Sequence, residues 1–171
     1  AAGCGPGDEV LTVAFTWVAT VGAVLRVNAV PIFADIDPQT FTMDVEDARR
    51  KITPRTKAIL PVDFYGHPAP IPELMELAEE HGIVVIEDAC QAVGHLPVDV
   101  DVLGCDFLSA TGRKYLRAPR GTGFLYVRHP WIERLDPPFV DVHAAAWTSA
   151  DRYELRGDAR RFESWEHGVA G

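Results

Sequence analysis

The sequence predicts an α/β fold in which a mostly parallel sheet lies between two layers of helices. Short apolar, β-branched runs alternate with segments of helical period through most of the chain. Residues 83–86 are four consecutive β-branched side chains, which is typical of a strand buried on both faces. The 171 residues, of which 47% are hydrophobic, are enough for one substantial core.

The alternation places the elements in order along the chain. Strands are expected at 9–14, 31–36, 57–62, 83–86, 105–110 and 121–128, and helices at 17–28, 44–52 and 72–81. Asp44 is expected to cap the second helix, with Asp47 near its positive end. Pro72 suits the start of the third helix and Gly82 its end. Beyond these elements we expect an extended connector at 135–139 and the start of a helix within 162–169.

The composition argues against several classes of protein. The formal net charge is −9 with no basic patch, which argues against nucleic acid as a main partner. No stretch is long and apolar enough to span a membrane. Three cysteines without metal-ligand spacing favour reduced thiols in a cytoplasmic protein with no metal site. The chain shows no signal peptide, and its abrupt ends suggest a sequence truncated at both ends.

Two segments carry residues of chemical interest: Ile86-Glu87-Asp88-Ala89-Cys90-Gln91 and Ser109-Ala110-Thr111-Gly112-Arg113-Lys114. Because the carboxyl ends of parallel strands meet at one edge of a sheet, Asp88 and Lys114 are expected on the same rim. A lysine amine forms a Schiff base with an aldehyde, and a carboxylate stabilises a protonated pyridine nitrogen. The pair therefore predicts pyridoxal 5'-phosphate (PLP) as cofactor.

Four further residues supply what PLP needs from a protein. Trp17 offers a flat apolar face for the ring, and Gln91 offers a donor for the phenolic oxygen. Thr111 and Arg113 flank the lysine and offer a hydroxyl and a cation to the phosphate.

Each of these residues also has an ordinary alternative. A lone aspartate such as Asp88 usually caps a helix or forms a turn, and Gln91 suits a cap as well. Lys114 in an arginine-rich loop suits solvated surface, Trp17 on a helical stripe suits the core, and Thr111 suits a strand. The prediction therefore depends on the joint order of these residues in the chain.

The segments from Asp-Ala-Cys-Gln-Ala-Val-Gly-His (88–95) through Ser-Ala-Thr-Gly-Arg-Lys-Tyr-Leu-Arg (109–117) to Arg-Arg-Phe-Glu-Ser-Trp-Glu (160–166) form a long and specific pattern. With them, residues 88–166 resemble the class V aminotransferases. Within that family, the cysteine desulfurase and isopenicillin N epimerase-like members are most similar.

Another set of motifs covers the first half: Gly-Asp-Glu-Val-Leu (7–11), Phe-Thr-Trp-Val-Ala-Thr (15–20), Pro-Ile-Phe-Ala-Asp-Ile-Asp-Pro (31–38), Tyr-Gly-His-Pro-Ala (65–69) and Ile-Glu-Asp-Ala (86–89). Here residues 5–91 resemble the DegT-type sugar aminotransferases. The two resemblances meet at residues 88–91, as in a natural mosaic, a designed chimera or an assembly artefact. Both imply a fold-type-I PLP-dependent transferase, whose large domain is a three-layer α/β sheet.

The resemblance also implies roles for individual residues. Lys114 would be the catalytic Schiff-base lysine, Asp88 would pair with the pyridine nitrogen, and Gln91 would bond the phenolic oxygen. Thr111 matches a hydroxyl residue that helps to hold the phosphate. Trp17 matches the aromatic residue that stacks on the ring in the sugar branch.

The sequence departs from both families in several places. Arg113 stands where many class V members have histidine, so its role is open. The glycine- and serine-rich loop that cups the phosphate and the small C-terminal domain have no counterpart in the sequence. The loop that bears the nucleophilic cysteine of desulfurases is missing too. None of Cys4, Cys90 and Cys105 is therefore assigned as a sulfur acceptor, and Cys90 is expected to fill space.

Together these observations predict a PLP-binding large-domain core over residues 1–128, followed over 129–171 by a connector and the start of a C-terminal segment. The expected function is that of a PLP enzyme core acting on the amino groups of small molecules. Its intact parent would be a homodimeric aminotransferase or a class V relative such as a desulfurase, lyase or epimerase. The alternatives are a non-catalytic fragment that binds PLP weakly, a sugar aminotransferase-type parent, and an unrelated α/β binding protein.

Overall fold

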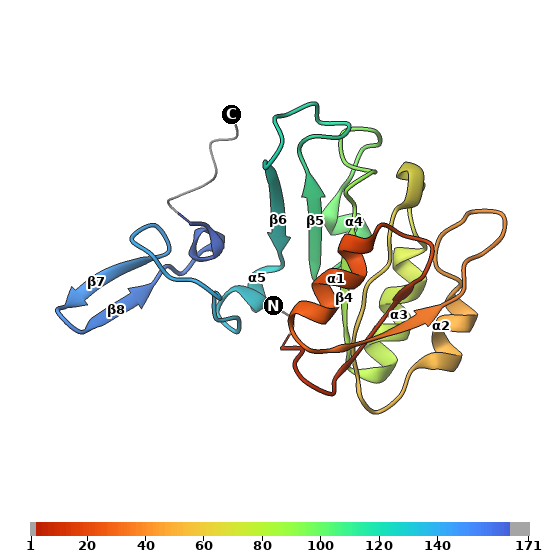
Figure 1. Ribbon diagram of the computed structural model, residues 1–171, viewed down its shortest axis with the longest axis horizontal. Helices are drawn as coiled ribbons and strands as arrows, with labels where there is room; N and C mark the ends of the chain where they lie inside the picture. The colour runs from red at the N-terminus through yellow and green to blue at the C-terminus, as the bar shows by residue number, and fades with distance from the viewer. Residues whose placement is uncertain (1–2, 165–171) are drawn as a thin grey trace.

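A computed structural model describes residues 3–164 and contains a six-stranded sheet (Figure 1). Its strands are β1 (Glu9–Val13), β2 (Val30–Ala34), β3 (Thr56–Ile59), β4 (Val84–Asp88), β5 (Phe107–Thr111) and β6 (Gly123–Val127). They lie in the order β2-β1-β3-β4-β5-β6, and only the pairing of β5 with β6 is antiparallel. The mostly parallel sheet predicted from the sequence is confirmed.

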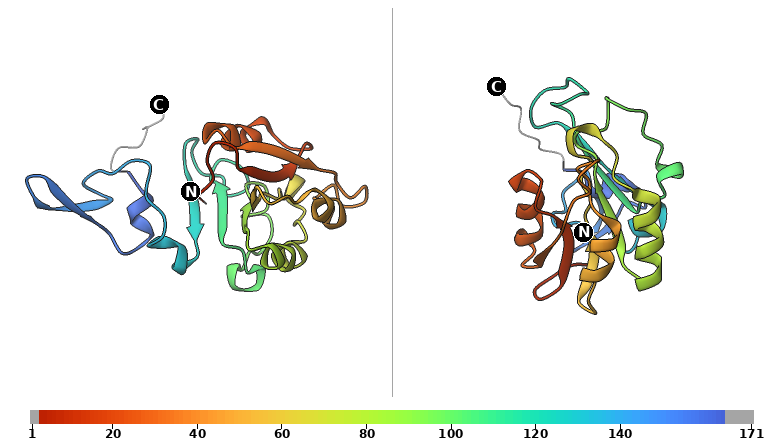
Figure 2. Two further views of the ribbon diagram at one scale, coloured as in Figure 1. Left: turned by 90° about the horizontal axis from the view of Figure 1, so that it is seen from below. Right: turned by 90° about the vertical axis from the view of Figure 1, so that its right-hand side faces the viewer.

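Helices cover both faces of this sheet. The helices are α1 (Val18–Arg26), α2 (Val45–Lys51), α3 (Ile71–His81), α4 (Val100–Leu103) and α5 (His129–Ile132). Figure 2 shows α1 on one side of the sheet and α2 and α3 on the other. Neighbouring residues of β1 accordingly face different cores, because side chains alternate along a strand. Leu11 packs in the cluster with Leu77 of α3, and Val10 packs in the cluster with Val24 of α1.

The predicted helix caps are present. The Asp44 side chain accepts a hydrogen bond from the Asp47 backbone N–H at 2.9 Å and begins α2. A bond from Lys51, with help from the Asp35 N–H, lowers the pKa of Asp47 to about 2. Gly82 ends α3 in the left-handed conformation, with φ 66°.

Each strand differs from its predicted bounds by one to three residues at one or both ends, and two of these differences bear on the site. β4 runs two residues beyond the predicted end and includes Asp88, because Asp88 pairs with Ser109 of β5. β3 ends at Ile59 rather than at residue 62. Pro61 has no backbone N–H to continue the ladder, and only an isolated bridge joins Val62 to Asp88.

The last third of the described chain was mostly not foreseen. The strands β7 (Ala145–Ser149) and β8 (Arg152–Leu155) form a hairpin that projects from the sheet (Figure 1). The 3-10 turn η2 (Ala159–Phe162) follows, and Glu163 is extended, so the helix expected within 162–169 does not begin at its first residues. The rest of that range, from residue 165, lies outside the described residues.

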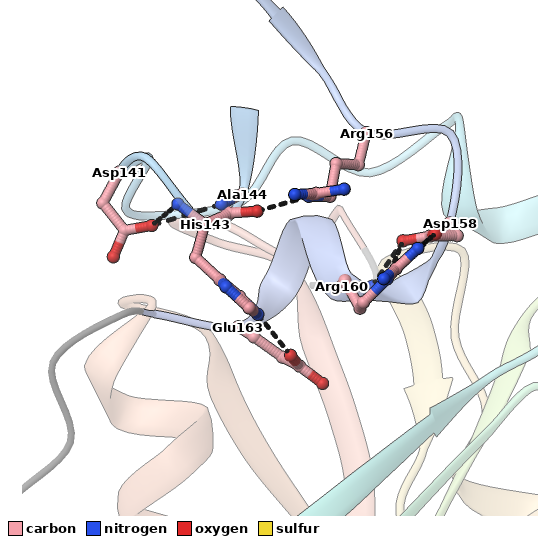
Figure 3. A network of polar contacts seen from close by, with 7 residues as sticks. All are labelled: Asp141, His143, Ala144, Arg156, Asp158, Arg160 and Glu163. Carbon is pink, nitrogen blue, oxygen red and sulfur yellow. Dashed lines mark hydrogen bonds and ion pairs between the residues drawn. The ribbon is translucent and has the colours of Figure 1, made fainter. Parts of the chain in front are cut away.

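A polar network holds the base of the hairpin (Figure 3). The Asp141 carboxylate accepts from the N–H groups of His143 and Ala144, and the Arg156 side chain donates to the His143 carbonyl. The His143 ring contacts the Glu163 carboxylate at 2.9 Å. These contacts connect the segment before β7 to the turn after β8.

Candidate active site

Asp88 lies at the carboxyl end of β4, and two donors hold its carboxylate. The Thr20 hydroxyl of α1 donates at 3.1 Å, and the Cys90 backbone N–H donates at 3.3 Å. Since the Thr20 hydroxyl hydrogen is directed to Asp88, the 2.8 Å contact between the Thr16 and Thr20 hydroxyls is a bond donated by Thr16. The start of α1 thus fixes the orientation of the carboxylate.

Lys114 lies half-buried in the loop that joins β5 to β6. The Gly112 N–H donates to the Thr122 carbonyl at 2.9 Å, which closes the loop on itself. The ring of Tyr115, next to the lysine, packs on the ring of His95, with centroids 4.4 Å apart. The loop is therefore held against the turn that follows Asp88.

Two glycines allow the loops to approach this closely. The turn η1 (Phe64–Gly66) follows β3, and a Cβ on Gly66 (φ 80°) would lie 2.8 Å from the Gln91 carbonyl oxygen. A Cβ on Gly94 (φ 84°) would lie 2.9 Å from the Leu116 N atom. Any other residue at either position would separate the loops that surround the site.

These loops enclose a cavity of about 340 Å³ at the strand ends. Its lining is formed by Thr16, Trp17, Phe64, Gln91, Arg113 and Lys114. The structure thus brings together four of the residues singled out in the sequence: Trp17, Gln91, Arg113 and Lys114. The indole of Trp17 is 70% exposed, so the ring is available to cover a ligand.

The other two predicted residues do not line this cavity. Asp88 connects to its wall through the Thr20 and Thr16 hydroxyls. Thr111 is the last residue of β5 and pairs with Gly123 of β6, so it starts the loop that carries the lysine. Its predicted contact with a phosphate stays a prediction.

Two residues of the site, Thr20 and Phe64, were not among those predicted from the sequence. Thr20 lies in the first turn of α1, and its hydroxyl meets that of Thr16, which lies just before the helix, so their contact depends on how the chain enters α1. Phe64 was missed because its place depends on how η1 folds back over the cavity. A second pair of carboxyls, Asp63 and Glu87, is buried behind the site and was not noticed either.

The chemistry of these residues fits a pyridine aldehyde phosphate. Lys114 offers the amine, and Asp88 offers a fixed carboxylate within the same strand-end cluster. Trp17 offers a ring face, Gln91 an amide and Arg113 a guanidinium. The burial of Cys90 and its proximity to Asp88 raise the pKa of its thiol to about 12, while Lys114 acts in the opposite direction.

The fold and this site define the large, cofactor-binding domain of a fold-type-I PLP-dependent transferase. The profile of the DegT/DnrJ/EryC1/StrS aminotransferase family matches residues 1–99, and the chain belongs to this family. A UDP-N-acetyl-3-dehydro-alpha-D-glucosamine 3-aminotransferase from Acidithiobacillus ferrooxidans is 52% identical over 90 residues, which cover 53% of the chain and 24% of that protein. The chain spans about a quarter of the length of the curated relatives to which it is similar.

Solved structures of two kinds are similar to the chain, and they cover different shares of it. NtdA from Bacillus subtilis, solved with its bound cofactor PMP, has a TM-score of 0.60 and 40% identity, with 64% of this chain and 25% of that one covered. The apo cysteine desulfurase from Thermococcus onnurineus NA1 has a TM-score of 0.78 and 26% identity, with 96% and 42% covered. The sequence likeness to sugar aminotransferases thus belongs to the first part of the chain, whereas the fold likeness to the class V enzymes covers nearly all of it.

Residues 3–164 contain neither a cluster of metal ligands nor a membrane-spanning helix. These residues contain no group of three His, Cys, Asp or Glu side chains placed to hold a metal ion. In the same residues, no helix has the length and apolar character needed to cross a membrane.

Proposed function

We propose that the chain is the PLP-binding core of an enzyme that transfers amino groups of small molecules, with Lys114 as the lysine that binds the cofactor. The observation that carries the proposal is the shared cavity of Lys114, Gln91, Trp17 and Arg113 beside an anchored Asp88. Family membership supports it, because the family is one of aminotransferases.

The residues would divide the work as follows. Bound PLP supplies an aldehyde that joins amines and a ring that accepts electrons from the substrate carbon. Asp88 holds the proton on the ring nitrogen, and its two donors keep its carboxylate oriented for that bond. The Lys114 amine would take the proton from the substrate carbon that bears the amino group, which lets the amino group pass to the cofactor. Trp17 excludes water from one face of the ring.

We propose a keto sugar as the acceptor of the amino group, rather than a reaction that releases sulfur from cysteine. Two of the relatives are named as aminotransferases of UDP-linked keto sugars. Burial raises the pKa of all three cysteine thiols, and that of Cys105, like Cys90, to about 12. Thiols that stay protonated are poor nucleophiles, so none of the three suits a sulfur acceptor.

The test is fixation of the cofactor on one lysine. The purified chain is mixed with PLP and reduced with borohydride, and the modified peptide is found by mass spectrometry. We expect a pyridoxyl group on Lys114, with none in Lys114→Ala. Lys57→Ala is the matched control, since Lys57 is an exposed lysine on β3 and lies away from the cavity. Equal labelling of several lysines would contradict the proposal.

The second candidate is a non-catalytic core that keeps the fold and binds PLP weakly. The large exposure of Trp17 favours it, because the ring contact stays open to water. Titration of PLP separates the two, since a weak binder would show Lys114 labelling only at PLP concentrations that also label Lys57. The amino-transfer half-reaction with a nucleotide keto sugar then tests the acceptor, and release of sulfide from cysteine would overturn it.

We further propose that residues 1–128 form the cofactor-binding core and that residues 129–171 form a connector and the start of a C-terminal segment. The Arg128 side chain supports this, because it donates to the Cys105 carbonyl and ties the end of β6 to the start of β5. We also propose that the complete enzyme is a homodimer. Size measurement by light scattering tests this in the presence of PLP.

A further inference from the structure

Two carboxyl groups are buried directly behind the proposed cofactor site. Glu87 precedes Asp88 in β4, so its side chain lies on the opposite face of the sheet. Asp63 follows β3 and lies beside it, with the two carboxyls in hydrogen-bonding contact. Each residue is only 1% exposed. Two full negative charges at such a place would lack the hydration that both require.

The hydrogen-bond accounting is incomplete for this pair. Asp63 Oδ1 accepts from the Ala69 N–H at 2.9 Å. Glu87 Oε2 is buried, and no donor in residues 3–164 reaches it. A cation is not supplied either, since neither carboxyl forms a salt bridge in the described part of the chain. One donor to the Glu87 carboxyl is therefore missing among the described residues.

The surrounding groups do not supply the missing charge. The titratable and charged groups around the pair are His67 after η1, Asp88 on β4, Asp99 at the start of α4, Cys105 before β5 and Arg128 after β6. His67 and Asp88 act on Asp63 with opposite signs. Arg128 is directed at backbone carbonyls and Asp106, and the Cys105 thiol is the only one of these groups that bonds Glu87.

We propose that Asp63 and Glu87 hold one proton between them, and that this singly charged pair positions Asp88 for the cofactor. The proton is the donor that Glu87 Oε2 lacks, and it leaves the pair with a single negative charge. The second half of the proposal rests on the proposed function, whereas the first half concerns the chain alone.

Backbone hydrogen bonds connect the carboxyl pair to the position of Asp88. The Asp63 N–H donates to the Asp88 carbonyl at 3.1 Å, and the Asp88 N–H donates to the Pro61 carbonyl at 3.0 Å. Asp63 also precedes η1, whose Phe64 lines the cavity. Loss of the shared proton would place two like charges between the ends of β3 and β4 and push these ends apart. Asp88 and Phe64 would then move together.

Burial raises the pKa of both carboxyls, which fixes the sign of the pH dependence. Above about pH 5 the unfolded chain has released both protons, whereas the folded chain keeps one. Stability therefore falls as the pH rises, by up to about tenfold in the folding equilibrium constant per pH unit. The loss of stability ends at the pH at which the pair releases its shared proton in the folded chain.

The first experiment measures urea unfolding of the whole chain without PLP between about pH 5 and about pH 9. Glu87→Gln is the test variant, because its amide donates to Asp63 without a titratable proton. We expect the wild-type midpoint to fall with pH relative to that of Glu87→Gln. The control is Glu9→Gln, since Glu9 is 2% exposed but bonded to Thr53 and paired with Arg55, which lower its pKa. This control should keep the wild-type fall across the same range.

A direct reading of the proton comes from infrared spectroscopy. We expect a protonated-carboxyl band at neutral pH that disappears in Glu87→Gln. Parallel pH profiles for wild type and Glu87→Gln, or the absence of that band, would overturn the shared proton. So would stabilisation of the wild type by methylammonium, the probe for a cation in the 150 Å³ cavity that both carboxyls line.

The positioning half is tested by the pH dependence of PLP affinity, measured by fluorescence quenching. We expect the wild-type affinity to weaken several-fold across the range in which the pair releases its proton, and this dependence to be lost in Glu87→Gln. An identical pH profile in both proteins would overturn positioning. Failure of the proposed function would look different: PLP would not bind the wild type at all, while the unfolding profiles would still report the proton.

Discussion

Asp88 and Lys114 are the two residues proposed to anchor the cofactor, and different kinds of structure hold them in place. Asp88 belongs to a strand that is paired on both sides, and a hydroxyl of α1 orients its carboxylate. Lys114 belongs to a loop that is held by a close contact at Gly94 and by the packing of Tyr115 on His95. The first anchor therefore depends on hydrogen bonds at a strand end, and the second on how tightly two loops pack.

The two anchors also differ in which comparison covers them. Asp88 lies within residues 1–99, which match the aminotransferase family, whereas Lys114 lies outside them. A cofactor that bonds both Asp88 and Lys114 would bind with an affinity that depends on their relative position. Substitutions that move only one anchor therefore test which of the two limits the site, and the lysine side is expected to be the more sensitive.

The largest effect is expected from Gly94→Ala, which attacks the lysine anchor. A left-handed conformation costs a non-glycine residue about 1–2 kcal/mol, and the new Cβ would lie 2.9 Å from the Leu116 N atom. Because that atom is backbone, the lysine loop has to shift, and we expect at least tenfold weaker labelling of Lys114 by PLP and borohydride.

The matched control is Gly82→Ala at the end of α3. Gly82 has φ 66° but nothing within 4 Å of the added Cβ, so this variant bears only the conformational cost. It should lose stability to urea while its Lys114 labelling stays near the wild-type level. Equal loss of labelling in both variants would show that general stability, rather than loop position, governs the lysine anchor.

Thr20→Val is expected to have the next largest effect and acts on the aspartate anchor. The substitution keeps the shape but removes the donor to Asp88 Oδ2. An unsatisfied carboxylate oxygen costs about 1–3 kcal/mol, so PLP affinity by titration should fall about tenfold. Thr16→Val removes a bond one step further away and should cost less. The reverse order would mean that Thr16 contacts the ligand directly.

Tyr115→Ala should have a smaller effect on the lysine anchor. Loss of its contact with His95 removes about 0.5–1.5 kcal/mol of packing. We expect labelling of Lys114 to slow several-fold and Tyr115→Phe to restore it. Trp147→Ala is the control, since its ring packs on Tyr153 in the exposed hairpin, with centroids 6.2 Å apart, and should leave labelling unchanged.

The same contrast explains how much the sequence could predict. The strands, the cap at Asp44 and the strand-end position of Asp88 depend on local patterns, and the structure confirms them. The wall formed by Phe64 depends on how separate loops meet, which no short pattern encodes. The hairpin β7–β8 is exposed on both faces, so it lacks the alternation that marks a half-buried strand. The predicted roles of the site residues stay predictions until the cofactor is tested.

Cys90 lies between the two anchors and should have the smallest effect. Its backbone N–H donates to Asp88, and this bond survives in Cys90→Ala. PLP affinity measured by titration should therefore stay within about twofold of the wild-type value, which is a free-energy change well below 1 kcal/mol. Because the pKa of the thiol is raised to about 12, little thiolate forms near neutral pH. Alkylation of Cys90 by iodoacetamide should accordingly be slow in the folded chain, as followed by mass spectrometry, and should accelerate on unfolding. Rapid alkylation of the folded chain would contradict the raised pKa. It would mean that the positive charge of Lys114 outweighs the effects of burial and of Asp88 on the Cys90 thiol.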